Sequence, residues 1–205
     1  CHCGSLLNHG DLSVLSFHAT KVFNTFEGGA IVCSNSKSKK RINYLKNFGH
    51  SGEVNVVATG INGKMSEFNA ALGLAQLKHI DVVIQKRQVI DRLYRTRLAT
   101  VKGIHCLAGS GEMVANYAYF PILVDHDYPI KRDELYERMK ENGVHPRRYF
   151  YPLISNFSMY RGLPSASKDN LPIASKVAEQ VLCLPIYPDL EINIVEDICR
   201  FIAEQ

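Results

Sequence analysis

The sequence has no long apolar run. No stretch approaches the roughly 18 consecutive apolar residues that a membrane-spanning helix needs. The chain also does not open with a charged segment followed by an apolar one, which is the pattern of a secretory leader. These two absences predict a cytoplasmic protein.

The sequence also lacks a strong excess of charge of one sign. Its formal net charge of +4 is small and dispersed, which does not indicate a nucleic-acid-binding protein. One basic run, at 37–41, opens a predicted helix after Ser36. We interpret this run as a solvated helix face, with phosphate binding as the alternative.

A disulfide framework is missing as well. The six cysteines are scattered, and several lie in apolar patterns that are typical of reduced core residues. Cys1-His2-Cys3, with His9 nearby, could suggest a metal site, but a second paired cluster is absent. We therefore expect no bound metal.

The rest of the composition is that of an ordinary globular protein, and 205 residues are enough to bury a core. Short apolar segments predict strands at 12–17, 30–34, 117–124 and 144–149. Helical spacing predicts helices at 36–48, 66–84, 86–97, 131–142, 171–181 and 191–203. The glycine- and asparagine-rich segment 48–61 predicts a loop.

These elements predict an α/β chain. We expect the end of a large-domain sheet in 1–80, a connecting helix in 81–103 and a small α/β domain in 104–205. Ser66 is the predicted N-cap of the long helical region, although Asn69 at the N3 position does not complete a capping box.

The most informative segment runs from Ser16 to Lys21 and is followed by Glu27-Gly28-Gly29. It places a lysine at the mouth of a short apolar strand. A lysine amine attacks an aldehyde only when it is neutral, so a Schiff-base lysine is expected where packing excludes water. Ser16 could donate its hydroxyl to a phosphate next to that amine. A solvated loop lysine is the alternative, and the whole string favours the reactive one.

This segment resembles the lysine motif of the DegT/DnrJ/EryC1/StrS family, the pyridoxal phosphate (PLP)-dependent sugar aminotransferases of the aspartate-aminotransferase fold (fold type I). The segment 60–77 is similar to the second signature of the family, and 147–153 and 182–185 are similar to its C-terminal signatures. The resemblance extends in order from about residue 10 to the end of the chain.

The resemblance implies roles for several residues. Lys21 would bind PLP covalently and then carry the proton between cofactor and substrate, and Ser16 would contact the cofactor phosphate. His18 would either face the cofactor or pack within the loop. Asn62 would reach the phosphate held by the partner subunit of a homodimer, whereas spacing alone would make it a turn residue before Gly63.

Two further motifs are more ambiguous. The glycines of Glu27-Gly28-Gly29 are expected to serve backbone geometry rather than to bind the cofactor. Lys64 stands where the family often has arginine, and lysine lacks the bidentate fork of a guanidinium.

A basic and aromatic cluster follows the predicted strand at 144–149. It consists of Arg147, Arg148, Tyr149 and Tyr151. Two guanidiniums and two phenol rings suit a diphosphate and a sugar or base, so we list these residues as candidates for substrate binding. Strand aromatics with solvated arginines would give the same pattern.

The implied activity is transamination of a nucleotide-linked, dTDP-type keto-6-deoxysugar, with glutamate as donor, for cell-surface polysaccharide. The sequences of segments 64–68 and 148–152 are most similar to those of family members that act on dTDP-4-keto-6-deoxyglucose. The dehydratases of the same family carry histidine at the position of Lys21, so the lysine argues against that alternative.

The chain starts at Cys1 and enters a core strand almost at once, whereas family chains are roughly twice as long. We therefore expect that an N-terminal half is absent. That half would carry the acid at the pyridinium nitrogen, the stacking aromatic and most phosphate donors. The 205-residue chain alone is then expected to be inactive. The alternative is an inert remnant or a regulatory half that a partner keeps folded.

Overall fold

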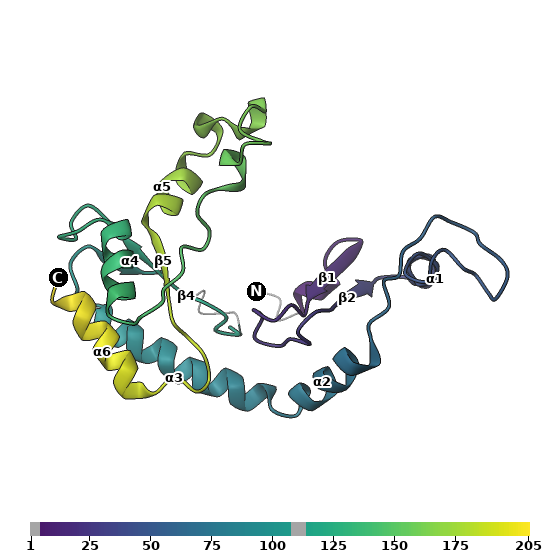
Figure 1. Cartoon of the computed structure of the whole chain (residues 1–205), viewed down its shortest axis with the longest axis horizontal. Helices are drawn as coiled ribbons and strands as arrows, with labels where there is room; N and C mark the ends of the chain where they lie inside the picture. The colour runs from purple at the N-terminus through teal and green to yellow at the C-terminus, as the bar shows by residue number, and fades with distance from the viewer. Residues whose placement is uncertain (1–4, 108–113) are drawn as a thin grey trace. The chain divides into compact units, whose positions relative to one another are not determined.

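The computed structural model describes residues 5–107 and 114–205 (Figure 1). The chain divides into two units, Cys1–Asp81 (unit 1) and Val82–Gln205 (unit 2). The segment Cys1-His2-Cys3, considered above for metal binding, lies outside the described residues. In the part that is described, none of the helices combines the length and the apolarity needed to cross a bilayer.

Unit 1 is built on an antiparallel ribbon of two strands. Its elements are the short 3-10 helix Leu6–Asn8, β1 (Leu12–Ser16), β2 (Gly29–Cys33), α1 (Ser36–Leu45) and α2 (Glu67–Leu77). The ribbon pairs Ser16 with Gly29, so the loop that carries Lys21 joins the two strands. Ser66 caps α2, and its side chain accepts the N–H of Asn69, which confirms the predicted start of that helix.

The described residues of unit 2 form a three-stranded sheet and four α-helices. Its elements are α3 (Ile80–Leu98), which begins just before the boundary, β3 (Ile104–Cys106), β4 (Phe120–Val124), α4 (Arg132–Glu141), α5 (Pro172–Gln180), β5 (Val181–Leu184) and α6 (Ile192–Ala203). Three 3-10 turns, Ile154–Asn156, Pro164–Ala166 and Lys168–Asn170, precede α5. The strand order is β3-β4-β5, and both pairings are antiparallel.

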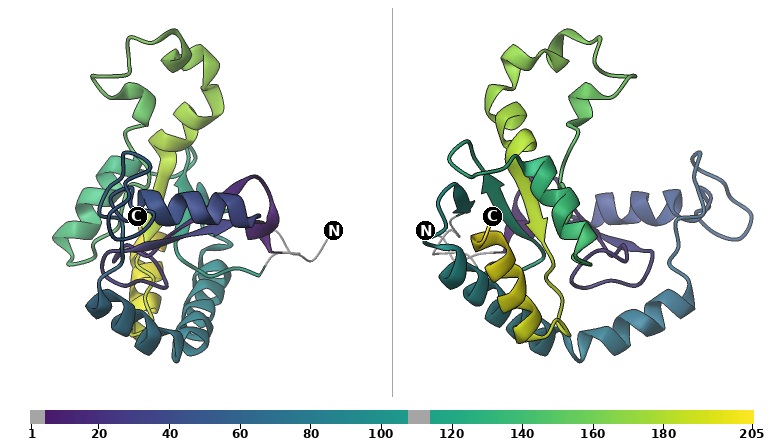
Figure 2. Two further views of the ribbon diagram at one scale, coloured as in Figure 1. Left: turned by 90° about the vertical axis from the view of Figure 1, so that its right-hand side faces the viewer. Right: turned by 60° about the vertical axis from the view of Figure 1, so that its left-hand side comes forward.

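The hydrophobic core of unit 2 lies between this sheet and its helices. Helices α3 and α6 lie side by side in Figures 1 and 2, and both contribute to the core together with α4. The Tyr94 ring of α3 stacks on Phe120 of β4 with centroids 4.8 Å apart, and its hydroxyl donates to the Pro185 carbonyl at 3.0 Å. Burial of aromatic rings with a satisfied hydroxyl is a strong stabilising contribution.

The strand predicted at 144–149 is wrong. Of that segment, only Arg147 pairs with the sheet, through an isolated bridge to Cys183 of β5. Pro146 has no N–H to donate, so it cannot take part in a regular ladder. The strand that pairs with β4 is instead β5, whose four residues follow α5 directly and were not predicted as a strand.

Unit 1 has very little core of its own. All residues of the core cluster belong to unit 2, and Thr25 is the one buried non-glycine residue among the described residues of unit 1. One face of the ribbon leaves Leu12, Val14 and Ile31 exposed by 47%, 76% and 46%. Unit 1 therefore needs apolar surface from elsewhere to be stably ordered.

Hydrogen exchange on the 205-residue chain is expected to separate the two units. The amides of β4, β5 and α6 should exchange slowly, because they belong to a buried core, and those of β1 and β2 should exchange fast. Peptide-level deuterium uptake measures this difference. Equal protection of β1 and β4 would show that unit 1 is stable without further apolar surface.

Candidate active site

The loop between β1 and β2, residues 17–28, carries Lys21. Its base is closed by two backbone hydrogen bonds, from Phe17 N–H to the Gly28 carbonyl and from Thr25 N–H to the Phe17 carbonyl, both 2.9 Å. The rings of Phe17 and Phe23 meet edge to face with centroids 5.0 Å apart. The loop is therefore a compact structure rather than an open connection.

Thr25 is the buried centre of this loop. It is 2% exposed, and its hydroxyl donates to the Glu27 carbonyl at 2.8 Å. Its own carbonyl accepts the side-chain amide of Asn69 on α2 at 2.5 Å. One turn further along α2, a Cβ on Gly73 would lie 2.8 Å from the Thr25 methyl carbon. Helix α2 thus packs directly on the loop that carries Lys21.

Gly28 is required by the same crowding. Its φ is +155°, and a Cβ there would lie 2.4 Å from the Thr25 hydroxyl oxygen. Any side chain at this position would displace Thr25. This crowding is the physical reason for a glycine at position 28, which the sequence analysis expected to serve backbone geometry.

Lys21 is half-buried, and its backbone is fixed on both sides. Its N–H donates to the His18 carbonyl at 2.9 Å, and its carbonyl accepts the side-chain amide of Asn24 at 3.2 Å. Within residues 5–107 and 114–205, the Lys21 amine has no hydrogen-bond or ion-pair partner. The amine is therefore available for reaction with an aldehyde.

Ser16 and His18 lie next to Lys21 in the chain. Ser16 ends β1 with an exposed side chain, and its hydroxyl oxygen accepts the His18 N–H at 3.4 Å. His18 Nδ1 accepts the N–H of Thr20 at 3.2 Å, so the ring proton belongs on Nε2, which lies 3.6 Å from a Glu27 carboxylate oxygen. The described polar contacts of the His18 ring are thus with residues of its own loop.

Asn62 lies beside the end of α1. It forms an isolated antiparallel bridge with Asn47, and the neighbouring Gly63 N–H donates to the Lys46 carbonyl at 2.8 Å. The Lys64 amine donates to the Asn47 side chain at 2.8 Å, so it already has a partner. The Asn62 side chain is exposed and has no partner among the residues that the structure describes.

The four substrate-binding candidates of unit 2 differ in whether other side chains of the folded chain already engage them. Arg147 is fixed through its backbone, which exchanges hydrogen bonds of 3.0 and 2.7 Å with Cys183, while its side chain is exposed and unpaired in the described part of the chain. Tyr149 meets Tyr119 edge to face at 5.5 Å. Arg148 is ion-paired with Asp133 at 2.8 Å, and the Arg132 guanidinium lies over the Tyr151 ring.

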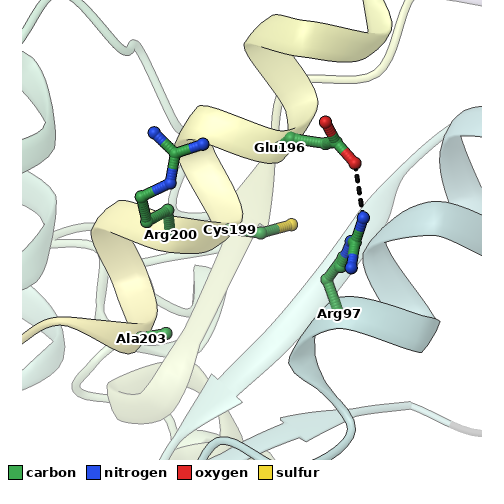
Figure 3. A pocket seen from close by; sticks show the side chains of 5 residues that line it. All are labelled: Arg97, Glu196, Cys199, Arg200 and Ala203. Atoms are coloured by element: carbon green, nitrogen blue, oxygen red, sulfur yellow. Dashed lines mark hydrogen bonds and ion pairs between the residues drawn. The ribbon is translucent and has the colours of Figure 1, made fainter.

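A hollow of about 290 Å³ between α3 and α6 is a poor alternative site (Figure 3). It is lined by Arg97, Glu196, Cys199, Arg200 and Ala203. Arg97 pairs with Glu196 at 2.5 Å, and Arg200 pairs with the neighbouring Asp197 at 3.1 Å. Burial raises the pKa of the Cys199 thiol to about 11, so the thiol is not a nucleophile at neutral pH.

Asn69 and Gly73 belong to the segment that resembles the second family signature, and Thr25 follows the lysine motif, but the sequence alone does not predict the contact among these three residues. The available signal was the i, i+4 spacing of Asn69 and Gly73, which places both residues on one face of α2.

Gly73→Ala is expected to displace the lysine loop, because its methyl group would clash with Thr25. Overpacking of this kind costs about 1–3 kcal/mol, which outweighs the gain of less than about 1 kcal/mol in helix propensity. Thermal unfolding of the full-length polypeptide measures the loss. Thr25→Ser removes the clashing methyl and should restore stability to the Gly73→Ala variant. Gly52→Ala, which meets nothing within 4 Å, is the matched control.

Comparison with known proteins identifies relatives of the chain. Two curated relatives are each called dTDP-4-amino-4,6-dideoxy-D-glucose transaminase. The protein from Escherichia coli is 56% identical over 86% of this chain and 48% of its own length, and the one from Shigella dysenteriae is 48% identical over 98% and 54%. The chain thus spans about half the length of the curated relatives it matches.

Solved structures share the fold. DesI, solved in the presence of its TDP-sugar product, superposes with a TM-score of 0.87 and 35% identity over 95% of this chain and 49% of its own. This shared fold confirms the predicted fold class. The family model of the DegT/DnrJ/EryC1/StrS aminotransferases matches residues 4–203, and the chain therefore belongs to this family.

Proposed function

We propose that the full-length polypeptide that contains this chain is a PLP-dependent aminotransferase. It converts a dTDP-linked keto-6-deoxysugar to the aminosugar, with glutamate as donor, for cell-surface polysaccharide synthesis in the cytoplasm. The observation that carries the proposal is the amine of Lys21, which has no partner among the described residues, on a loop that Thr25 and α2 hold in place. The names of the two transaminase relatives support the sugar class.

The residues of the lysine loop fit PLP. The half-buried Lys21, whose amine is unpaired in the described part of the chain, and the exposed Ser16 lie at the same end of the ribbon. Bound PLP supplies an electron sink that stabilises negative charge at the substrate carbon. Lys21 Nζ would hold the aldehyde carbon of the cofactor covalently and, once released, take the proton from the substrate carbon. Ser16 would donate its hydroxyl to the phosphate.

The exposed Arg147 side chain and the half-buried Tyr149 ring would bind the nucleotide sugar. The Arg147 guanidinium is unpaired within the described residues, and its backbone is fixed to β5, so it can bind the diphosphate without reorganising the chain. The Tyr149 ring meets Tyr119 edge to face and stacks on Phe150, so its other face would be the surface for a sugar or base.

Lys21 is expected to be the residue that reacts with PLP. When the full-length polypeptide is incubated with PLP and reduced with borohydride, peptide mapping should find the modification on Lys21. Lys21→Ala should lower the transamination rate by at least about 10²–10⁴-fold, because this one amine serves as nucleophile and base. Lys37→Ala, on the exposed surface of α1, should change neither result. Labelling of another lysine with Lys21 unmodified would refute the assignment.

We also propose a homodimer in which Asn62 of one subunit contacts the cofactor phosphate of the other. Co-expressed Lys21→Ala and Asn62→Ala subunits should then recover activity, because one of the two sites of the heterodimer keeps both residues. The measurement is the specific activity of the purified heterodimer relative to both parents. Both variants must be folded, and Asn62→Ala alone must be impaired. A heterodimer no more active than its parents would exclude a site shared through Asn62.

A further inference from the structure

The first turn of α4 contacts the segment 147–151, which carries the candidate substrate-binding residues. One carboxylate oxygen of Asp133 lies 2.8 Å from Arg148 Nη1 and 2.8 Å from Arg132 Nε. This oxygen therefore connects an arginine of the segment with an arginine of the helix. The five residues Arg132, Asp133, Tyr136, Arg148 and Tyr151 are called the α4 clamp below.

Arg132 anchors the α4 clamp to the core of unit 2. Its side chain is 3% exposed, and its Nη1 donates to the carbonyls of Ala178 and Val181 at 3.1 and 2.8 Å. These carbonyls stand where α5 ends and β5 begins. A buried guanidinium needs a counter-charge, and Asp133 supplies it.

Two aromatic rings complete the α4 clamp. The Arg148 guanidinium lies 4.3 Å from the centre of the Tyr136 ring, and the Arg132 guanidinium lies 4.7 Å from that of Tyr151. Contacts of this length between a cation and a ring are attractive, more so where water is excluded. Arg148 and Tyr151 are thus engaged within the folded chain, unlike Arg147.

The charge state of Asp133 supports this geometry. Partial burial acts to raise the pKa of its carboxyl, but Arg148 and Arg132 together lower it below its ordinary value. The carboxyl is therefore ionised at neutral pH and attracts both guanidiniums.

We infer that Asp133 is a positioning residue, which holds Arg148 and thereby fixes the segment 147–151 so that Arg147 and Tyr149 can bind the nucleotide sugar. In this arrangement Arg148 and Tyr151 belong to the α4 clamp and are not substrate ligands. The inference rests on the proposed function for the identity of the ligand, a dTDP-linked sugar. The clamp itself rests only on contacts within unit 2.

Asp133→Asn distinguishes the two possible roles of Arg148 by the direction of its effect. If Asp133 positions the segment, loss of its charge releases Arg148, and dTDP should bind roughly tenfold more weakly, as expected for loss of a charged hydrogen bond. If Arg148 binds the diphosphate directly, the same change removes a competing carboxylate, and binding should be unchanged or tighter. Calorimetric titration of the full-length polypeptide with dTDP measures the difference.

A double-variant cycle adds a second criterion. Arg148→Met and Asp133→Asn/Arg148→Met should both match Asp133→Asn in dTDP affinity, because all three break the same pair. A double variant much weaker than Asp133→Asn would overturn the inference. Glu134→Gln is the matched control, since it removes a neighbouring charge in the same turn of α4 that pairs with Arg138, and it should leave dTDP binding unchanged.

Hydrogen exchange separates failure of this inference from failure of the proposed function. Asp133→Asn should speed exchange of the Arg147 amide, which donates to the Cys183 carbonyl, whether or not dTDP binds. Unchanged exchange in a folded variant would refute the positioning role. If wild-type polypeptide fails to bind dTDP while the exchange effect is present, the ligand class is wrong and the α4 clamp stands.

Discussion

The arrangement around Lys21 depends on the burial of one threonine. Thr25 is the point at which the lysine loop meets α2, through a hydrogen bond that joins residues 44 positions apart and through the space that Gly73 leaves for its methyl group. A larger residue at Gly73, or the loss of the Asn69 amide, would separate the lysine loop from α2, which belongs to the second family signature. The second signature thus has a mechanical role as well as any role at the cofactor, because it fixes the backbone from which Lys21 extends.

This local order contrasts with the sparse packing of unit 1. Its ribbon exposes Leu12, Val14 and Ile31, and burial of a side chain of this size stabilises a protein by about 1.5–3 kcal/mol. Unit 2 already buries its core, so the units differ in what they need from the rest of the polypeptide. The lysine loop is well formed internally, yet the strands on both sides of it require a covering surface before they can hold it rigidly.

Local pattern predicted the lysine ribbon and the presence of the helices, because their signals lie within a few residues. It placed the break in the long helical region between 84 and 86, whereas α2 ends at Leu77 and α3 begins at Ile80. Ser66 was identified as an N-cap from its neighbours alone, and the structure confirms it. Tertiary features were not predictable in this way. The strand expected at 144–149 is missing because Pro146 interrupts it. Strand β5 was not predicted because it is only four residues long and follows α5 without an intervening turn. The contact of Asn69 with Thr25 required knowledge of how the chain folds back.

The two adjacent arginines at 147 and 148 show why residue type alone could not assign the candidate substrate site. Both carry the same charge, but Arg148 is held in an ion pair with Asp133, whereas Arg147 keeps an unpaired guanidinium within the described residues. This segment therefore offers one unengaged guanidinium to a diphosphate, not two. A diphosphate carries more than one negative charge, so the remaining neutralisation must come from donors outside this segment. Selection among nucleotide sugars by this segment would then depend more on the placement of Arg147 and the Tyr149 ring than on total charge.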